Sequence, residues 1–153
     1  MNGCISPFSE KQLNPASYNL RIGENALVET RSGMEKVKLT NGFHLAPGGW
    51  ILCDVLEAIR VPPNLEAQVI LRSSAARRGW DHALAGYVDP GYQGVLTLEF
   101  QNCLRFQHLE LRTGMELVQL KYSRLTTVPS KDYAATGRYF GATHVEGNKD
   151  ATI

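Results

Sequence analysis

The stretch GVLTLEFQN (residues 94–102) alternates between apolar side chains and side chains of mixed character. Successive side chains of an extended chain point to opposite faces, so Leu96, Leu98 and Phe100 share one face. The other face carries Val95, Thr97, Glu99 and Gln101. The pattern predicts a β-strand with one buried face and a carboxylate, Glu99, in its middle. Burial of an unpartnered carboxylate is costly, so we expect a partner or a raised pKa for Glu99; the alternative is a solvated sheet face.

Other short β-rich runs lie on both sides of this strand, and turn signals separate them. The runs are WILCDVLEAIRV (50–61), AQVILRS (67–73) and MELVQLKYSRLTTV (115–128). The turn signals are Pro47-Gly48-Gly49, Pro62-Pro63-Asn64, Asp89-Pro90-Gly91 and Thr113-Gly114. This punctuation predicts an all-β barrel or sandwich. SSAARRG (73–79), with a capping Ser, and the opening SPFSEKQL (6–13) are expected to add one or two short helices.

The composition is that of one folded domain, which we expect to span residues 1–153. Hydrophobic residues make up 43% of the chain, and 16 Lys+Arg against 15 Asp+Glu give a net charge of +1. So small a surplus argues against a non-specific nucleic-acid binder. The apolar runs are far shorter than the ~20 residues that span a bilayer, and the first residues show no secretory leader. We therefore expect a cytoplasmic protein without nucleic-acid or membrane partners, and a mobile tail from about residue 138.

The cysteines and histidines do not indicate a disulfide framework or a metal site. Cys4, Cys53 and Cys103 are odd in number and widely spaced. The four histidines stand apart, and no CxxC or HxE grouping occurs. We therefore expect no protein-bound metal, and no zinc in particular.

Two segments carry side chains suited to nucleotide binding. RSSAARRG (72–79) places two hydroxyls beside three guanidiniums, a combination that can bind phosphate, although a solvated Arg/Ser loop is the alternative. AGYVDPGYQG (85–94) predicts a tight turn, in which Asp89 either caps a β-turn or accepts a sugar hydroxyl. In the second case Tyr92 would form a stacking wall under a deoxyribose, without room for a 2′-hydroxyl.

Taken together, these segments resemble a known superfamily. In order, the chain carries NPASYNLRIG (14–23), RSSAARRG (72–79), AGYVDPGYQGVLTLEFQN (85–102), RTGMELVQLKY (112–122) and GRYFGAT (137–143). This series resembles the dCTP deaminase/dUTPase superfamily, and Glu99 together with Asp89-Pro90-Gly91 is closer to the dCTP deaminases. The resemblance implies a distorted jelly-roll β-barrel and a homotrimer with active sites between subunits. It also implies that the C-terminal tail closes over the ligand.

The resemblance further implies a site that works without zinc. Glu99 would carry protons between the attacking water, the ring nitrogen and the leaving amine. Ser73 and the main chain near Ala85 would position that water, with Arg77 close by. The substrate would be bound by Arg72, Ser73, Ser74, Arg77, Ala85, Asp89, Tyr92, Thr97, Leu98, Gln119, Tyr133 and Arg138. A Mg²⁺ ion would be carried by the nucleotide triphosphate, with few or no protein ligands.

The expected activity is hydrolysis of dCTP to dUTP and ammonia. The alternative is a dUTP pyrophosphatase or a bifunctional enzyme that converts dCTP to dUMP, in which Asp89 would activate the water that attacks the α-phosphate. A third hypothesis is a catalytically silent, nucleotide-binding regulatory trimer. The intact RSSAAR and LTLE blocks count against this third hypothesis.

Overall fold

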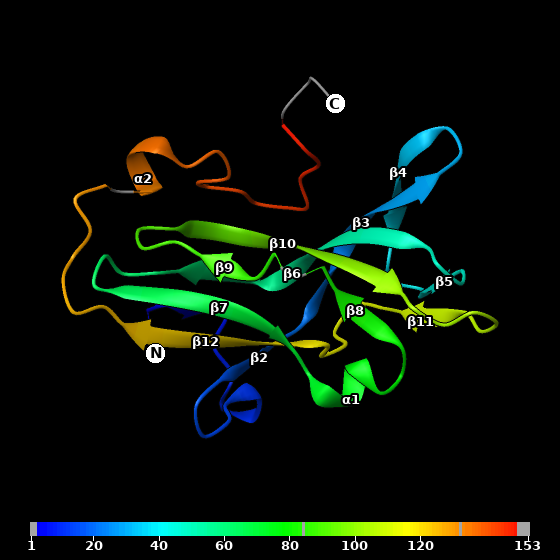
Figure 1. Ribbon diagram of the computed structural model, residues 1–153, viewed down its shortest axis with the longest axis horizontal. Coiled ribbons are helices and arrows are strands. Elements are labelled where there is room, and N and C mark those ends of the chain that lie inside the picture. The colour runs from blue at the N-terminus through cyan, green and yellow to red at the C-terminus, as the bar shows by residue number, and fades with distance from the viewer. Residues whose placement is uncertain (1–2, 84, 132, 150–153) are drawn as a thin grey trace.

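The computed structural model describes residues 3–83, 85–131 and 133–149, which fold mainly as β-strands (Figure 1). The strands are β1 (Ile5–Ser6), β2 (Tyr18–Leu20), β3 (Ile22–Thr30), β4 (Gly33–Lys38), β5 (Phe43–Leu45), β6 (Trp50–Arg60), β7 (Leu65–Leu71), β8 (Trp80–His82), β9 (Tyr87–Val88), β10 (Gln93–Asn102), β11 (Leu109–Leu111) and β12 (Val118–Arg124). The helices are α1 (Ser73–Ala76), α2 (Tyr133–Thr136) and the 3₁₀ turn η1 (Glu10–Gln12).

Two sheets stack to make the body of the molecule. In the described residues the larger sheet has the order β4-β3-β6-β10-β8, with β1 added to β6. The second sheet has the order β2-β12-β7-β9, and β11 pairs with β5 separately. Figure 1 shows β7 and β12 running beneath β6 and β10. The jelly-roll-like, all-β fold is confirmed, although hydrogen bonds between the described strands do not close the two sheets into a barrel.

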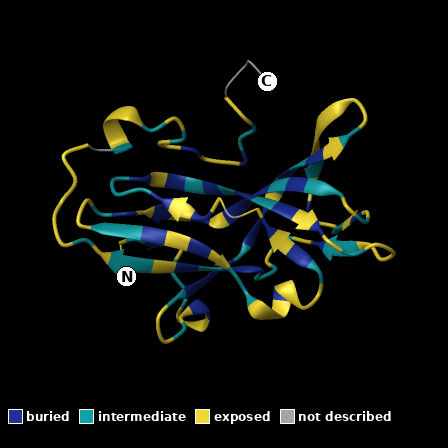
Figure 2. Ribbon diagram, in the orientation of Figure 1, coloured by how far each residue is buried: buried dark blue, intermediate teal, exposed yellow. Residues whose placement is uncertain are grey.

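Strand β10 shows why the chain folds in this way. Leu96, Leu98 and Phe100 are buried, as their alternation predicts, and Phe100 packs edge-on against Trp80. Full burial of each such side chain stabilises a fold by about 1.5–3 kcal/mol. The dark blue segments in Figure 2 lie mostly on the strands of the two sheets. On the opposite face of β10, Val95, Thr97 and Glu99 are only half-buried.

The predicted strands are present as β6, β7, β10 and β12, but three local expectations were wrong or incomplete. The hairpin β3–β4 was not predicted. Ser73 begins α1 instead of capping it, because Arg72 takes the N-cap position without a side-chain hydrogen bond. The opening helix is the single 3₁₀ turn η1, and the Ser9 side chain makes no capping hydrogen bond there.

The C-terminal segment, residues 139–149, lies along β10 above the larger sheet (Figure 1). The Gly141 N–H donates to the Gln93 carbonyl at 2.7 Å, and the Val95 N–H donates to the Ala142 carbonyl at 2.7 Å. Gly94 permits this approach, since a Cβ there would lie 2.9 Å from the Ala142 nitrogen. Mobility of the tail from about residue 138 stays a prediction, and residues 150–153 lie outside the described residues.

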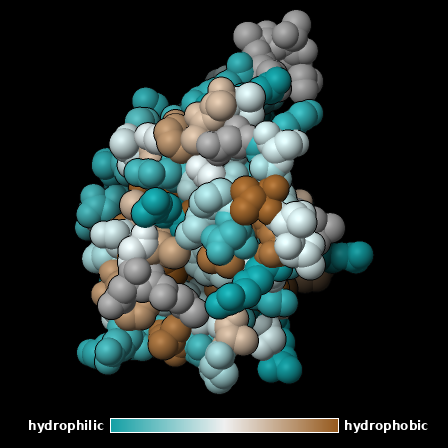
Figure 3. All heavy atoms as spheres, turned by 90° about the vertical axis from the view of Figure 1, so that its left-hand side faces the viewer, coloured by the Kyte–Doolittle hydropathy of each residue, from teal (hydrophilic) through white to brown (hydrophobic). Residues whose placement is uncertain are grey.

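None of the helices in the described ranges is long and apolar enough to cross a membrane. Figure 3 looks onto the left-hand side of Figure 1, near α2. On this face, hydrophobic side chains form small patches among hydrophilic ones.

Candidate active site

A pocket of about 290 Å³ lies between β9, β10 and the C-terminal segment. Many of the side chains predicted to bind substrate line it. They are Ala85, Asp89, Tyr92, Thr97, Leu98, Glu99 and Tyr133. The C-terminal segment adds further lining residues, among them Tyr139 and Ala142 of the GRYFGAT stretch, and Glu146, which the sequence did not single out. Their contribution follows from backbone pairing with β10, for which the sequence GRYFGAT offers no period-2 signal.

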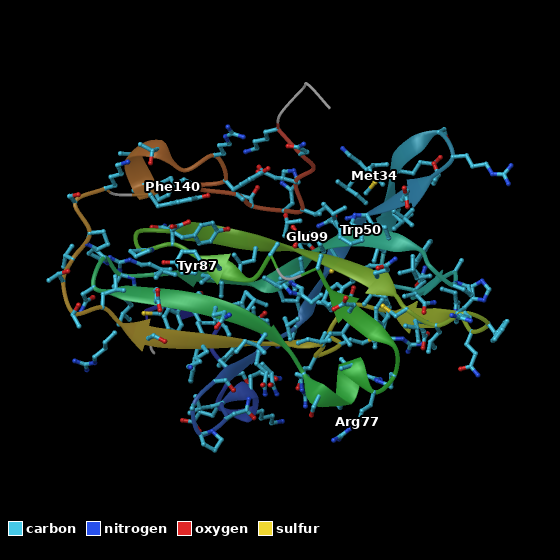
Figure 4. The ribbon with its side chains drawn as sticks, in the orientation of Figure 1. Met34, Trp50, Arg77, Tyr87, Glu99 and Phe140 are labelled. Carbon is cyan, nitrogen blue, oxygen red and sulfur yellow. The ribbon has the colours of Figure 1, made fainter. Side chains whose placement is uncertain are left out.

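Glu99 lies on the pocket face of β10, and Figure 4 shows it on the side of the sheet that faces the C-terminal segment. Burial raises the pKa of the Glu99 carboxyl above its ordinary value, and a backbone hydrogen bond offsets part of that effect. Its Oε2 atom is buried and has no hydrogen-bond partner among the described residues. A carboxyl group with these properties can exchange protons with a ligand, so the solvated-face alternative for Glu99 does not hold.

The turn after β9 forms one wall of the pocket through Asp89 and Tyr92. The Tyr92 N–H donates to the Asp89 carbonyl at 3.1 Å, and Gly91 between them has φ +86°, a value that favours glycine. The Tyr92 hydroxyl donates to the Val95 carbonyl at 2.9 Å. Its ring lies 5.6 Å from the Tyr133 ring, centroid to centroid. Tyr92 is thus a fixed aromatic wall next to the half-buried Asp89 carboxylate.

Thr97 connects β10 to the C-terminal segment, residues 139–149, which forms the cover of the pocket. The Thr97 hydroxyl oxygen accepts a 3.0 Å hydrogen bond from the backbone N–H of Glu146. Lys149 makes an ion pair with Glu146 at 2.7 Å and lies 4.9 Å from the centre of the Tyr139 ring. It also donates to the Arg138 carbonyl at 2.8 Å, so Arg138 belongs to this cover although it does not line the pocket.

The Arg-Ser loop, residues 72–79, lies elsewhere in the same chain. Strand β7 passes the pocket at Val69 and then carries the chain away to α1. Ser73, Ser74 and Arg77 are exposed and do not line the pocket. Figure 4 shows Arg77 at the lower edge of the molecule beside α1, whereas Glu99 lies between β10 and the C-terminal segment, above the second sheet. A single chain therefore does not bring the predicted proton carrier and the predicted phosphate loop together.

Arg72 and Gln119 belong to a second polar cluster beside this loop, in which Glu116 and Asn19 connect them. Arg72 Nη1 donates to Glu116 Oε2 at 2.6 Å. Asn19 Nδ2 donates to the same oxygen at 2.8 Å, and Asn19 Oδ1 accepts from Gln119 Nε2 at 3.3 Å. The register of β2 against β12 places Asn19 opposite Gln119. Glu116 is the member that the sequence did not reveal, because it stands outside any alternating pattern.

Within residues 3–83, 85–131 and 133–149, no three His, Cys, Asp or Glu side chains come together as a possible metal site. The cysteines in these ranges are free, and Cys53 is buried.

Comparison with known proteins identifies the family. The dCTP deaminase-like family model matches residues 1–125. The dCTP deaminase of Thermococcus kodakarensis is 37% identical over 145 residues, which are 95% of this chain and 90% of that protein. A protein of Nanoarchaeum equitans named dCTP deaminase, dUMP-forming, is 32% identical, with 95% and 90% covered.

Solved structures share the fold at lower sequence identity. The 2′-deoxycytidine 5′-triphosphate deaminase of Agrobacterium tumefaciens has a TM-score of 0.69 at 21% identity. The match covers 81% of this chain but only 44% of that chain. An EIAV dUTPase has a TM-score of 0.52 at 21% identity, with 76% of this chain and 92% of that chain covered. By the family match and its relatives, the chain belongs to the dCTP deaminase-like family within the dCTP deaminase/dUTPase superfamily.

Proposed function

We propose that this protein is a hydrolase that converts dCTP and water to dUTP and ammonia. The observation that carries the proposal is Glu99, a carboxyl group with a raised pKa and an unpartnered buried oxygen inside a pocket of about 290 Å³. Relatives at 37% and 34% identity bear the name dCTP deaminase, which supports the same substrate.

In the proposed reaction, water attacks C4 of the cytosine ring. Glu99 accepts a proton from this water as the C–O bond forms and delivers it to N3 of the ring. The carboxyl group then transfers the proton of the new C4 hydroxyl to the amine. The C–N bond breaks, ammonia leaves, and the ring that remains is uracil. One group can act in both directions because burial brings its pKa closer to the working pH. Ser73, Arg77 and the main chain at Ala85 are assigned to hold the water.

Most of the pocket residues are assigned to the nucleoside half of the substrate. Asp89 accepts a hydrogen bond from the 3′-hydroxyl, and Tyr92 packs under the deoxyribose. Thr97 and Leu98 run alongside the base next to Glu99. Tyr133, which contacts Tyr92 in the pocket wall, and Arg138 are assigned to the phosphate end.

The triphosphate half requires more cations than Arg138 of the pocket cover alone provides. The ionisable carboxylates of the pocket are Asp89, Glu99 and Glu146, and no Arg or Lys is among its described lining residues. A triphosphate is bound most effectively by guanidinium groups and backbone N–H donors. Such groups are provided by residues that do not line the pocket of their own chain, namely Arg72, Ser73, Ser74, Arg77 and Gln119. We therefore assign them to the pocket of a neighbouring copy, in a homotrimer with active sites between subunits.

Mg²⁺ enters this proposal as part of the substrate, bound to the triphosphate oxygens. No side chain of the described residues is assigned to it. A cytoplasmic location and a single domain over residues 1–153 with a mobile tail complete the proposal.

One observation favours a second candidate, the dUMP-forming activity. Asp89 and Glu99 line the same pocket, so one carboxylate could serve deamination while the other activates water for attack on the α-phosphate. The Nanoarchaeum equitans relative bears the dUMP-forming name.

The test is to incubate the protein with Mg²⁺ and dCTP or dUTP and to measure ammonia and pyrophosphate separately. Ammonia from dCTP without pyrophosphate is the expected result. Pyrophosphate from both substrates would establish the dUMP-forming alternative. Nucleotide binding without either product would overturn both enzymatic assignments.

A further inference from the structure

We propose that Glu116 is a positioning residue that holds the Arg72 guanidinium and the Gln119 amide as one preformed unit for the nucleotide. The proposal rests on the proposed function, since it takes Arg72 and Gln119 as nucleotide contacts. Glu116 lies in the loop just before β12. Its Oε2 atom accepts hydrogen bonds from Arg72 Nη1 at 2.6 Å and Asn19 Nδ2 at 2.8 Å, so one oxygen joins two elements.

The loop before β12 fixes both the backbone and the side chain of Arg72. The Arg72 N–H donates to the Leu117 carbonyl at 2.8 Å. Arg72 Nη1 also donates to the Glu116 backbone carbonyl at 3.1 Å. In the described contacts, the guanidinium donates through Nη1 alone, which leaves Nε and Nη2 for phosphate oxygens. An arginine that is already ordered loses less side-chain entropy when a ligand binds.

The same carboxylate also orients Gln119. A carboxylate only accepts hydrogen bonds, so Glu116 requires the Asn19 amide nitrogen to face it. The Asn19 oxygen is thereby turned toward Gln119 Nε2 at 3.3 Å and Asn14 Nδ2 at 2.8 Å. Gln119 consequently directs its amide nitrogen toward Asn19, which sets the direction of the Gln119 carbonyl oxygen. Arg72 and Gln119 therefore change orientation together if Glu116 is removed.

The partial exposure of the Arg72–Glu116 ion pair indicates that it contributes more to nucleotide binding than to folding stability. The Arg72 and Glu116 side chains are 29% and 30% exposed, so a ligand can reach them. Ion pairs in contact with water contribute little to folding stability. A matched pair in the same chain provides the comparison: Glu110 and Arg112 also form an ion pair, but at a more exposed position outside the cluster.

The test measures dCTP affinity by calorimetry and KM and kcat by ammonia release for Glu116→Ala, Glu116→Gln and the control Glu110→Ala. Glu116→Ala is expected to weaken dCTP binding and raise KM about tenfold, the loss of a charged hydrogen bond, with kcat within about twofold. Glu116→Gln is expected to restore most of the affinity, because its amide oxygen can accept from both donors. Glu110→Ala should match the wild type.

A double-mutant cycle with Arg72→Ala isolates the interaction. In the Arg72→Ala background, Glu116→Ala should weaken dCTP binding less than it does in the wild type, because only the orientation of Gln119 is left to lose. Neither change should affect binding of deoxycytidine, which lacks phosphate. Unchanged dCTP affinity in folded Glu116→Ala would overturn the proposal. It would also be overturned if the effects of Arg72→Ala and Glu116→Ala on dCTP affinity were fully additive, or if Glu116→Gln bound dCTP more tightly than the wild type. If the wild type binds dCTP but releases no ammonia, the proposed function fails, while the affinity ratios still decide the role of Glu116.

Discussion

The pocket under the C-terminal segment and the Arg-Ser loop have opposite chemical characters. The pocket is lined by the carboxylates of Asp89, Glu99 and Glu146, and backbone hydrogen bonds hold its cover on β10. The loop is exposed and cationic, and it faces away from the pocket of its own chain (Figure 4). Among the described residues, the lining of the pocket includes a proton carrier but no Arg or Lys, whereas the loop has three Arg residues but no carboxylate. Each region provides what the other lacks, and this complementarity is why we assign them to one site across two copies.

The largest expected effect separates chemistry from binding within the pocket. Glu99→Gln removes the proton carrier while keeping its shape, so ammonia release should fall by about 10²–10⁴-fold or more. The affinity for dCTP should change little, because Glu99 is not assigned to the phosphates. The measurement combines an ammonia assay with calorimetry, and the exposed Glu24→Gln on β3 is the control. Substantial turnover by Glu99→Gln would remove this residue from the mechanism.

The next effect tests the loop. Arg72→Ala should weaken dCTP binding by about 1–3 kcal/mol, the contribution of a hydrogen bond between charged groups. Binding of deoxycytidine should be unaffected, since that ligand has no phosphate. Arg78→Ala, a change of the same type in the same loop, is the control for a general loss of positive charge. Equal losses for dCTP and deoxycytidine would show that the loop acts on the nucleoside or on the fold.

A smaller effect concerns the cover of the pocket. Gly94 has φ +149°, and a Cβ at this position would lie 2.9 Å from the Ala142 nitrogen. Gly94→Ala should therefore displace the C-terminal segment from β10 and destabilise the fold by about 1–3 kcal/mol. Hydrogen exchange at Val95, whose N–H donates to Ala142, should rise first. Protection equal to the wild type would mean that this contact does not hold the cover.

The smallest effect is a pH dependence of stability. The folded chain holds the Glu99 proton more tightly than the unfolded chain, because burial raises the pKa above 4.5. The resulting stabilisation is complete at low pH and is lost as the pH rises through the raised pKa. The melting temperature of the wild type should therefore fall relative to that of Glu99→Gln above about pH 4.5. A difference that stays constant with pH would contradict the burial of this carboxyl.

Local patterns predicted those parts of the molecule that depend on neighbours in sequence. The alternation of Leu96, Leu98 and Phe100 predicted the buried face of β10 and left Glu99 on the other face. The turn around Gly91 followed from the residue types that tolerate positive φ. The hairpin β3–β4 was missed because its second strand, Gly33–Lys38, is mostly exposed and lacks an apolar face.

Contacts between distant segments could not be predicted in the same way. Glu116 meets Arg72 because β7 and β12 are paired, and the two residues are 44 positions apart in the chain. The cover of the pocket depends on the Glu146 N–H meeting Thr97, 49 positions away. The separation of Arg77 from Glu99 is a property of sheet topology, and it became visible only in three dimensions (Figure 4).

The most direct test of a site shared between copies is complementation between two inactive variants. Glu99→Gln lacks the proton carrier in the pocket, and Arg77→Ala lacks an exposed cation of the loop. If sites form between subunits, randomly mixed trimers should recover about a quarter of the wild-type ammonia release, because some sites combine an intact pocket with an intact loop. If each chain works alone, the mixture will show only the summed activities of the two variants, and the assignment of the loop to a neighbouring pocket will be contradicted.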